Sequence, residues 1–285
     1  MIEAASEIIR QTTSTNGHDV DRHSVSVVKN TTPVSASRVA VLSDVHGNAV
    51  ALEAVLREVA AEEPELLVFG GDLTWGPLPE ATRELVAPLE HSALFVRGNA
   101  ERSLAEAAAR TQSGPADELT ERERWMLARH SADTLEFLAR FVEGAVIAIS
   151  GLGDVRFYHG SPRSDEELIT FATPEMRMRA LLGDVPQKVL VSAHTHIQFD
   201  RRIAGVRSVN PGSIGMPYEG KSGAAYWALL GPDVELRRTE YDVDEAVRRY
   251  RASDDPRAEQ MVEILVSPPT PDDVVADAEA REFAG

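Results

Sequence analysis

Short apolar runs that each stop at a polar or small residue recur along the chain and predict a sheet of parallel strands. The first run covers residues 39–42, and apolar residues at helical spacing follow it over 49–62. A second run at 66–69 precedes a predicted helix over 80–90, after which a third run covers 93–96. Strands that alternate with helices in this way indicate right-handed β-α-β units and an α/β fold.

The second half of the chain continues with helices and strands in a less regular order. Residues 100 to about 141 have an amphipathic helical pattern, and Thr120 with Glu123 predicts a capping box at a helix start. Two apolar runs on either side of Gly151 predict a hairpin. The remaining predicted elements are a helix at 174–182, strands at 188–192, near 197–209 and near 224–240, a turn at 210–213, and helices at 243–251 and 256–266.

These patterns divide the chain into three parts. Residues 1–37 are polar and show no period, so we expect a disordered leader. We expect one folded domain over 38–242, in which the helical segment 103–141 lies beside the functional site. Residues 243–285 form an acidic helical extension, whose Pro- and Asp-rich tail from Ser267 onward we expect to be loosely attached.

Charge and residue usage narrow the possible functions. The formal net charge is −17, which disfavours a nucleic-acid-binding face but allows a small nucleotide held by local metal ions. The chain has no cysteine, which excludes thiolate metal ligands and suits a reducing compartment. We find no secretory signal and no apolar run of about 18 residues, so we expect a cytoplasmic protein without a membrane span. The oligomeric state stays open.

Residues that can hold metal ions follow several of the predicted strands. Because strand ends in an open α/β fold meet at one edge of a sheet, we expect these side chains to lie together. All offer oxygen or nitrogen atoms, and seven such groups suit two ions that share a bridging carboxylate. Taken singly, each residue has a structural alternative, such as a turn, a helix cap or a buried histidine. The seven candidates are Asp44, His46, Asp72, Asn99, His159, His194 and His196.

The motifs that carry these residues resemble those of the calcineurin-like metallophosphoesterase superfamily. They are DVH at 44–46, GD at 71–72, GNAE at 98–101, HG at 159–160 and AHTH at 193–196. The chain is most similar to the small prokaryotic phosphoesterase branch, whose DxHGN, GDxxxxGP and NPGS motifs are present at 44–48, 71–77 and 210–213. The resemblance covers about residues 38–240. It implies a four-layer αββα sandwich of two mixed β-sheets flanked by helices.

The same resemblance implies the metal ligands and the chemistry. One ion would be held by Asp44, His46, Asp72 and His196, and the other by Asp72, Asn99, His159 and His194. Asp72 is then the bridge, and Asp72, Asn99 and His194 are also the catalytic candidates. Manganese is the expected metal, with iron, nickel, zinc or cobalt as alternatives. The two ions lower the pKa of a bridging water, and the resulting hydroxide attacks phosphorus in line with the leaving alkoxide.

Hydrolysis of small or nucleotide-like phosphodiesters is the favoured function, because this activity is common in the branch that the chain resembles. A phosphomonoesterase or protein phosphatase is the alternative enzyme, and a non-catalytic scaffold on the same fold is a further alternative. Scaffold members usually lose ligand residues, whereas every ligand motif is complete here. Substrate contacts are expected from Asn48, Arg163, Asn210 and Ser213, for which a turn or a surface ion pair is the structural alternative.

Two positions depart from the family pattern, and three other residues lie near its motifs. Many family members have a histidine where this chain has Ala100, and a glycine where it has Ala193. The first change could slow hydrolysis of poor leaving groups, and the second requires only a negative φ at Ala193. Trp75 and Tyr218 could wall the site, with core packing as the alternative, and Glu101 could support it from behind.

Overall fold

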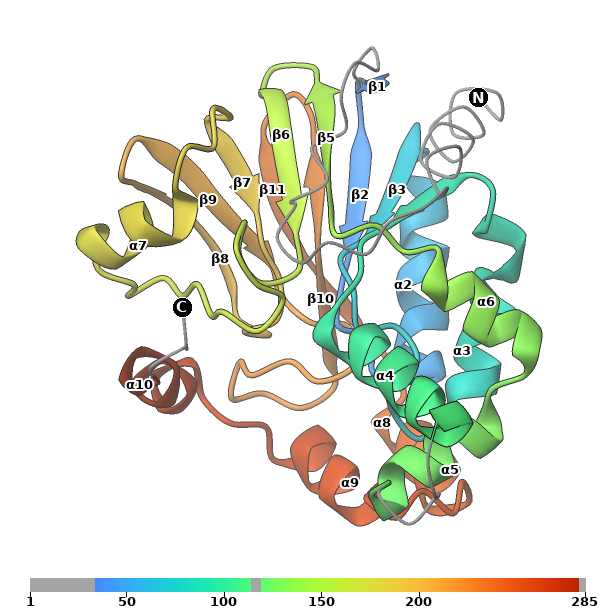
Figure 1. Cartoon of the computed structure of the whole chain (residues 1–285). Coiled ribbons are helices and arrows are strands. Elements are labelled where there is room, and N and C mark those ends of the chain that lie inside the picture. The colour runs from blue at the N-terminus through green and yellow to red at the C-terminus, as the bar shows by residue number, and fades with distance from the viewer. Residues whose placement is uncertain (1–33, 114–118, 282–285) are drawn as a thin grey trace.

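Two β-sheets packed face to face form the centre of the computed structural model, which describes residues 34–113 and 119–281 (Figure 1). Both sheets are mixed, because each contains parallel and antiparallel neighbours. The six-stranded sheet has the order β1 (Val34–Ala36), β5 (Gly144–Ile149), β6 (Gly153–Tyr158), β7 (Val189–Val191), β9 (Val206–Pro211) and β8 (Gln198–Ile203). The five-stranded sheet has the order β11 (Val234–Glu240), β10 (Ala224–Leu230), β2 (Val39–Leu42), β3 (Leu66–Phe69) and β4 (Ala93–Phe95).

Helices cover the outer faces of the sheets. Their bounds are α2 (Ala49–Ala61), α3 (Pro79–Val86), α4 (Asn99–Ser113), α5 (Glu121–Arg129), α6 (Ala132–Ala139), α7 (Glu175–Leu182), α8 (Val243–Arg251), α9 (Ala258–Val266) and α10 (Pro271–Ala280). Helices α2 to α6 pack on the five-stranded sheet, and α7 packs on the six-stranded sheet (Figure 1). The predicted capping box at the start of α5 is confirmed, because Thr120 and Glu123 each accept a hydrogen bond from the other's backbone N–H.

One apolar core separates the two sheets, and a second core lies beneath helices α2 to α6. Strand β2 contributes to both, because successive side chains of a strand point to opposite faces. Val39 and Val41 pack between the sheets with residues such as Phe157, whereas Ala40 and Leu42 pack toward the helices. The predicted four-layer αββα sandwich is therefore confirmed.

The carboxyl ends of the central strands meet at one edge of the sandwich, which we term the strand-end edge. Strands β2, β3 and β4 run parallel in one sheet, and β6, β7 and β9 run parallel in the other. Main-chain hydrogen bonds join the loops that follow them. The N–H of Asp44 donates to the carbonyl of Gly71 at 3.0 Å, and that of Ala193 donates to the carbonyl of His159 at 2.7 Å. The loops with the predicted ligands are thus held together.

The folded domain includes residues that the sequence pattern assigned to the leader. Residues 34–36 form β1, which pairs in parallel with β5 and places Ala36 beside Ile149. A strand of three residues is too short to show a period, and its partner lies far along the chain, so no local signal predicts it. The rest of the predicted leader, residues 1–33, lies outside the described residues.

The C-terminal tail also differs from the prediction of a loosely attached segment. Residues 271–280 form α10, which begins with Pro271 and has a capping box between Thr270 and Asp273. Proline at the first helical position and an acidic residue three positions after a threonine are both helix-start signals. We misinterpreted the proline and aspartate as marks of an irregular tail. The helix is held at its far end by side-chain contacts of Glu279.

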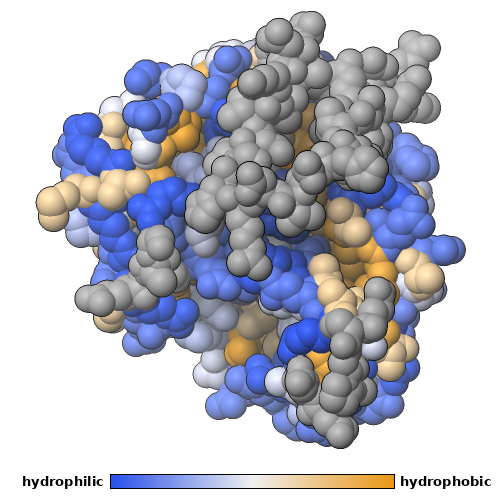
Figure 2. Space-filling view, viewed as in Figure 1, coloured by the Kyte–Doolittle hydropathy of each residue, from blue (hydrophilic) through white to orange (hydrophobic). Residues whose placement is uncertain are grey.

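The surface of the described residues is mainly polar, as the net charge of −17 leads one to expect. In the coloured part of the face that Figure 2 shows, hydrophilic residues predominate and hydrophobic residues lie in separate patches. Within residues 34–113 and 119–281, every helix is too short or too polar to cross a lipid bilayer.

Candidate metal centre

The predicted ligands have a backbone conformation that non-glycine residues rarely adopt. Eight described non-glycine residues have a positive φ, and five of them are predicted ligands, with φ between 46° and 65°. Such a conformation costs on the order of 1–3 kcal/mol per residue and persists only where the surrounding structure holds it. Strain that gathers at one edge of a fold points to a functional site. The five ligands are Asp44, His46, Asp72, His194 and His196.

Asp44, His46 and His196 form the first of two candidate metal-binding clusters, in which all three ligand atoms lie within 4.8 Å of one another. Nε2 of His196 lies 3.2 Å from Oδ1 of Asp44 and 3.1 Å from Nε2 of His46. Asp44 and His46 come from the loop after β2, and His196 comes from the loop after β7. Two loops from different sheets therefore supply one cluster.

Asp72, His159 and His194 form the second cluster. Nε2 of His159 lies 3.1 Å from Nδ1 of His194 and 3.0 Å from Oδ1 of Asn99, the first residue of α4. The four residues follow β3, β6, β7 and β4, so again both sheets contribute. All seven predicted ligands thus lie in one place.

Asp72 connects the two clusters through a single oxygen atom. Its Oδ2 lies 3.6 Å from Nε2 of His46 and 3.5 Å from Nε2 of His159. Its Oδ1 accepts a hydrogen bond from the backbone N–H of Ala100 at 2.9 Å, which turns Oδ2 toward the histidines. This arrangement suits a carboxylate that bridges two ions.

Three of the histidine rings have the tautomer that metal binding requires. Nδ1 of His46 lies 3.2 Å from the carbonyl of Trp75, and Nδ1 of His159 and of His196 each lies 2.8 Å from a carbonyl. A carbonyl can only accept, so each Nδ1 carries a hydrogen that it donates. In a neutral ring Nε2 then carries a lone pair. Nε2 of His46 and of His159 face Oδ2 of Asp72, and Nε2 of His196 faces Oδ1 of Asp44. The sequence could not reveal these backbone acceptors, because nothing in a residue's identity marks its carbonyl.

The donor set fits divalent cations, and one of its carboxylate oxygen atoms has no hydrogen-bond partner. Oδ1 of Asp44 is buried and accepts no hydrogen bond, although His196 Nε2 lies 3.2 Å away. Two lone pairs at that distance repel unless a cation lies between them. Imidazole nitrogen with carboxylate oxygen suits manganese, iron, cobalt, nickel or zinc. These observations favour metal ions in both clusters.

The electrostatics of the centre keep three of its ligand groups in the deprotonated form that a metal ion requires. Burial lowers the pKa of His46 to about 4, and burial with the neighbouring His159 lowers that of His194 to about 4. Burial opposes the charged form of His159 too, but Asp72 and then Asp44 outweigh it and raise the pKa of His159 to about 10. Burial acts to raise the pKa of Asp72, yet the surrounding histidines hold it below its usual range. His46, His194 and Asp72 are therefore deprotonated at neutral pH, and a metal ion would have to displace the proton of His159.

Glu101 holds the two loops that carry Asp72 and Asn99. Its carboxylate accepts hydrogen bonds from the backbone N–H groups of Asp72, Leu73 and Gly98 at 2.8 to 2.9 Å. Burial and the charge of Asp72 raise the pKa of Glu101 to about 7, against these three donors. Gly98 is required at this point, because a Cβ there would lie 2.1 Å from Oδ1 of Asp72. Through these contacts Glu101 supports the site from behind, as the sequence led us to expect.

We expect the variant Glu101→Gln to bind metal ions about 10- to 100-fold more weakly, the usual cost of losing a residue that orients a ligand. The amide can replace only one acceptor oxygen, so one or more N–H donors lose their partner. Titration of the metal-free protein with Mn²⁺ measures the change. Glu106→Gln, on the exposed face of the same helix, is the control and should bind as the wild type does. Equal affinity in the two variants would contradict this role.

Three of the four predicted substrate contacts are structural residues instead. Asn48, Asn210 and Ser213 have no exposed surface. Asn48 caps α2 by accepting from the N–H of Ala51 at 3.1 Å. Asn210 donates to the carbonyl of Ala193 at 2.9 Å, and Ser213 donates to that of Asp44 at 2.7 Å. Their polar atoms hold the ligand loops, which is the turn-type role that we considered as the alternative.

The fourth predicted contact, Arg163, is a surface residue. Its side chain is 44% exposed and pairs with Glu167 at 3.1 Å. The ion pair that we considered as the alternative is therefore present.

Ala193 does not have a positive φ, so alanine is tolerated before the His-X-His segment. Tyr218 stacks on the ring of His196 with centroids 4.7 Å apart, which places it at the site as predicted.

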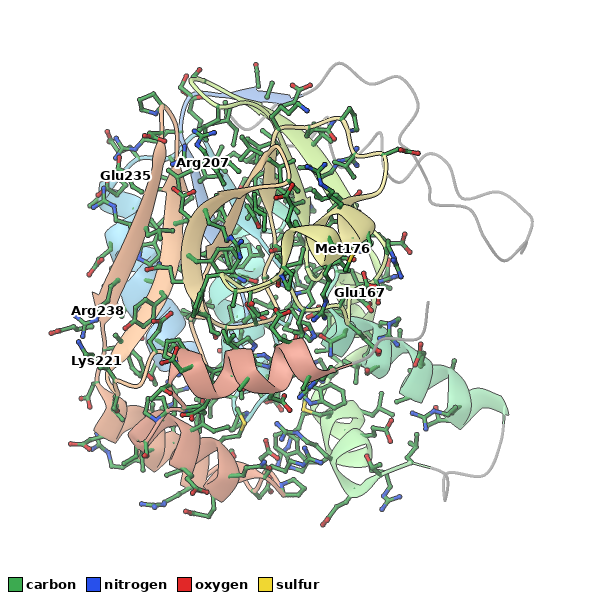
Figure 3. The ribbon with its side chains drawn as sticks, turned by 90° about the vertical axis from the view of Figure 1, so that its left-hand side faces the viewer. Glu167, Met176, Arg207, Lys221, Glu235 and Arg238 are labelled. Carbon is green, nitrogen blue, oxygen red and sulfur yellow. The ribbon has the colours of Figure 1, made fainter. Side chains whose placement is uncertain are left out.

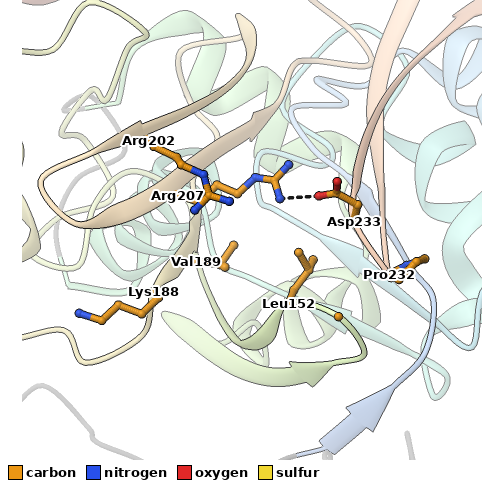
Figure 4. Close-up of a pocket in the computed structure, with 8 residues that line it drawn as sticks. Leu152, Lys188, Val189, Arg202, Arg207, Pro232 and Asp233 are labelled. Atoms are coloured by element: carbon orange, nitrogen blue, oxygen red, sulfur yellow. Dashed lines mark hydrogen bonds and ion pairs between the residues drawn. The ribbon is translucent and has the colours of Figure 1, made fainter.

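An open pocket of about 410 Å³ lies away from this centre (Figure 4). Its lining includes Lys188, just before β7, and Arg207, near the start of β9, which pairs with Asp233. These are the amino ends of the same strands whose carboxyl ends carry His194 and Asn210. The pocket is thus at the opposite end of the sandwich and is not part of the metal centre.

Comparison with known proteins places the chain in a family. Residues 38–230 match the calcineurin-like phosphoesterase superfamily domain. The structure is similar to that of the hypothetical protein PH1004 from Pyrococcus horikoshii OT3, with a TM-score of 0.69 and 21% identity over 83% of this chain and 100% of that one. It is also similar to a metallophosphoesterase from Sphaerobacter thermophilus, with a TM-score of 0.64 and 24% identity over 81% of this chain and 99% of that one.

These structural similarities, at such identities, show a shared fold. A search of curated proteins gives no significant match. The family match, in contrast, spans well over half of the chain and includes all seven residues of the candidate metal centre. The chain therefore belongs to the calcineurin-like phosphoesterase superfamily.

Proposed function

We propose that the protein is a dinuclear metal-dependent phosphodiesterase that acts on small or nucleotide-like phosphate esters. The observation that carries this proposal is the position of Asp72 Oδ2, 3.6 Å from Nε2 of His46 and 3.5 Å from Nε2 of His159. A carboxylate oxygen there faces both candidate clusters. Paired divalent ions that share a ligand in this way are a recurring arrangement in enzymes that cleave phosphate esters.

The ligand set divides between two ions that share Asp72. Asp44, His46, Asp72 and His196 would hold one ion, and Asp72, Asn99, His159 and His194 would hold the other. When bound, the ions would supply an activated water as the nucleophile and positive charge that stabilises the transition state. Manganese is our first choice among the metals that suit imidazole and carboxylate ligands.

The chain's own residues orient this centre and leave one side open. Backbone carbonyls fix the rings of His46, His159 and His196, and Glu101 fixes the loop of Asp72. Asn99 and His194 are only half-buried, whereas the other predicted ligands are buried. Substrate would therefore reach the centre from the side of Asn99 and His194.

A diester is favoured over a monoester because two arginines that closely follow ligands in the chain are already paired. Arg102, three residues after Asn99, pairs with Asp165 at 2.9 Å and with Glu166 at 2.6 Å. Arg163, four residues after His159, pairs with Glu167. A phosphomonoester carries close to two negative charges at neutral pH, and a diester carries one. Because the carboxylates neutralise both guanidinium groups, these arginines favour the less charged substrate.

Activity measurements on protein reconstituted with Mn²⁺ test the proposal. The panel should contain bis(p-nitrophenyl) phosphate, cyclic nucleotides, dinucleotides, p-nitrophenyl phosphate and phosphopeptides. We expect about two metal ions per chain and the highest kcat/KM on a small diester. Preference for the monoesters would favour a phosphomonoesterase or protein phosphatase. Protein that holds two ions but cleaves none of these substrates would contradict the proposal and favour a scaffold.

Metal binding should also stabilise the fold. Mn²⁺ at about 100 times its dissociation constant is expected to raise the free energy of unfolding by about 2.7 kcal/mol per site. For a chain of this size, each kcal/mol corresponds to about 2–4 °C in Tm. Calorimetry of metal-free protein with and without Mn²⁺ measures the shift. The double variant Asp44→Asn/Asp72→Asn should lose it, and a shift of equal size in that variant would place the metal elsewhere.

A further inference from the structure

The last described part of the chain lies at the strand-end edge, the same edge of the sandwich as the metal centre. Helix α10 lies beyond the ends of the strands, below the six-stranded sheet in Figure 1 and across the strand ends in Figure 3. We term residues 265–280 the C-terminal clasp. Its helix carries four acidic residues, Asp272, Asp273, Asp277 and Glu279.

On one side, the C-terminal clasp holds the loop that positions His196. The N–H of Gly220 donates to the carbonyl of Pro269 at 2.9 Å. Two residues earlier, Tyr218 donates its N–H to the carbonyl of His196 at 3.1 Å and stacks its ring on the His196 ring. Nδ1 of His196 in turn donates to the carbonyl of Met216. The C-terminal clasp therefore supports a loop whose aromatic side chain lies against a predicted ligand.

On the other side, Glu279 fastens α10 to the segment that follows His159. Its carboxylate accepts hydrogen bonds from the hydroxyl groups of Thr170 and Thr173, each at 2.7 Å, and pairs with Arg177 at 3.0 Å. Both threonines are almost completely buried, with 0% and 1% exposed. Buried hydroxyl donors are costly to leave unpaired, so these contacts give α10 one defined position.

Through these two sets of contacts, the C-terminal clasp connects two loops, each of which is associated with a ligand of a different cluster. The loop from Met216 to Gly220 serves His196 of the first cluster, and the segment with Thr170 and Thr173 continues from His159 of the second. Helix α10 has ten residues, so it is about 15 Å long and, with its side chains, about 10 Å across. A helix of this size therefore occupies space at the same edge of the sandwich as the metal centre.

We propose that the C-terminal clasp forms the wall of the substrate site on the side of His196 and restricts the enzyme to small phosphate esters, an inference that rests on the proposed function. The wall obstructs an extended polynucleotide sterically. Glu279 and Asp277 are paired with Arg177 and Arg281, so Asp272 and Asp273 supply the acidic charge that repels a polyanion. A small diester with a single charge experiences far less repulsion. Access through the half-buried side of Asn99 and His194 stays open to small molecules.

Substrates that share one chemical bond but differ in size test this inference. We compare the dinucleotide TpT with single-stranded oligothymidylate of about 20 nucleotides, using the Mn²⁺-loaded full-length protein. The wild type should cleave TpT with the higher kcat/KM. In Glu279→Ala, which removes the acceptor for both threonine hydroxyls, the ratio of kcat/KM for the oligomer to that for TpT should rise about tenfold.

The control variant is Glu259→Ala on α9, where the glutamate is 72% exposed and pairs with Arg251. It removes an equal charge from the same C-terminal region, and its ratio should stay at the wild-type value. Hydrogen exchange over residues 271–280 shows whether α10 has detached in Glu279→Ala. A chain that ends at residue 269, checked by circular dichroism and metal content, removes the helix altogether.

The possible outcomes separate the two proposals. A raised ratio in Glu279→Ala and in the shortened chain, but not in Glu259→Ala, supports the C-terminal clasp as the wall. An unchanged ratio in both, with α10 detached or removed, overturns this inference while leaving the phosphodiesterase in place. A wild type that cleaves both substrates equally well overturns it too. A metal-loaded wild type that cleaves no ester contradicts the proposed function itself.

Discussion

Replacement of Asp72 by asparagine is expected to lower kcat/KM for bis(p-nitrophenyl) phosphate by about a thousandfold or more. Oδ2 of Asp72 is the carboxylate oxygen that faces Nε2 of both His46 and His159. A neutral amide at this position removes the negative charge that two neighbouring cations would share. Loss of one ion removes several kcal/mol of transition-state stabilisation, and each 1.36 kcal/mol corresponds to a factor of about ten in rate.

Steady-state kinetics and metal analysis of the Mn²⁺-loaded variant test this expectation together. We expect fewer than two ions per chain along with the loss of activity. Asp200→Asn is the matched control, because Asp200 lies on β8 and forms a surface ion pair with Arg207. It should keep wild-type rates. Undiminished turnover in Asp72→Asn would mean that the metal centre is not the catalytic site.

Replacement of Asp255 by asparagine is expected to lower the free energy of unfolding by about 3–5 kcal/mol. Asp255 follows α8 and lies 3.2 Å from the guanidinium group of Arg122 on α5, with the two side chains 0% and 8% exposed. Burial lowers the pKa of Arg122, although the carboxylate partly compensates. Without Asp255, a charged guanidinium group is left buried and unpaired, which is the costly state of a broken buried ion pair.

Urea unfolding with a constant m-value provides the measurement. Asp254→Asn is a close control, because Asp254 is 70% exposed and contacts Arg129 and Trp125 of the same helix α5. Asparagine tolerates the positive φ of 55° at this position, and exposed ion pairs contribute at most about 1 kcal/mol. An equal loss of unfolding free energy in the two variants would show that the buried ion pair stabilises the fold no more than the exposed one does.

The Asp255 variant also bears on the boundary that we predicted at residue 243. Helices α8 and α9 pack against Val50 and Met216 of the main domain through Tyr250 and Met261. A single cooperative transition, destabilised by the loss of Asp255, would show that residues after 243 unfold with the domain. Two separate transitions would support an independent extension.

Several local elements were predictable because their signals are local. The strands before Asp44 and Asp72 are buried on both faces, so they are continuous apolar runs. The start of α10 carries the same kind of signal in Thr270 and Asp273, and only our interpretation of its prolines was wrong. Strand β1 has no such signal, because three residues beside a distant partner leave no period.

Substrate contacts were the least predictable part of the site. Asn48, Asn210 and Ser213 have side chains that can bind phosphate, and they lie within motifs near the ligands. Whether such a side chain meets solvent or a backbone carbonyl depends on how the loops pack. Here the loops enclose all three, and their polar atoms stabilise the loops instead.

The residues and their motifs were enough to predict which side chains could bind metal ions and that these would meet at one edge. The carboxyl ends of parallel strands meet at one edge of a sheet, so Asp44 and Asp72 were predictable neighbours from the pattern of strands. That His46 would meet His196, which follows a strand of the other sheet, came from the family resemblance. The tertiary structure alone decided which oxygen of Asp72 faces both clusters, which nitrogen of each ring carries the hydrogen, and that Glu279 docks α10 beside the centre. These features depend on contacts between backbone and side-chain atoms far apart in the chain, and no local pattern of residues encodes them.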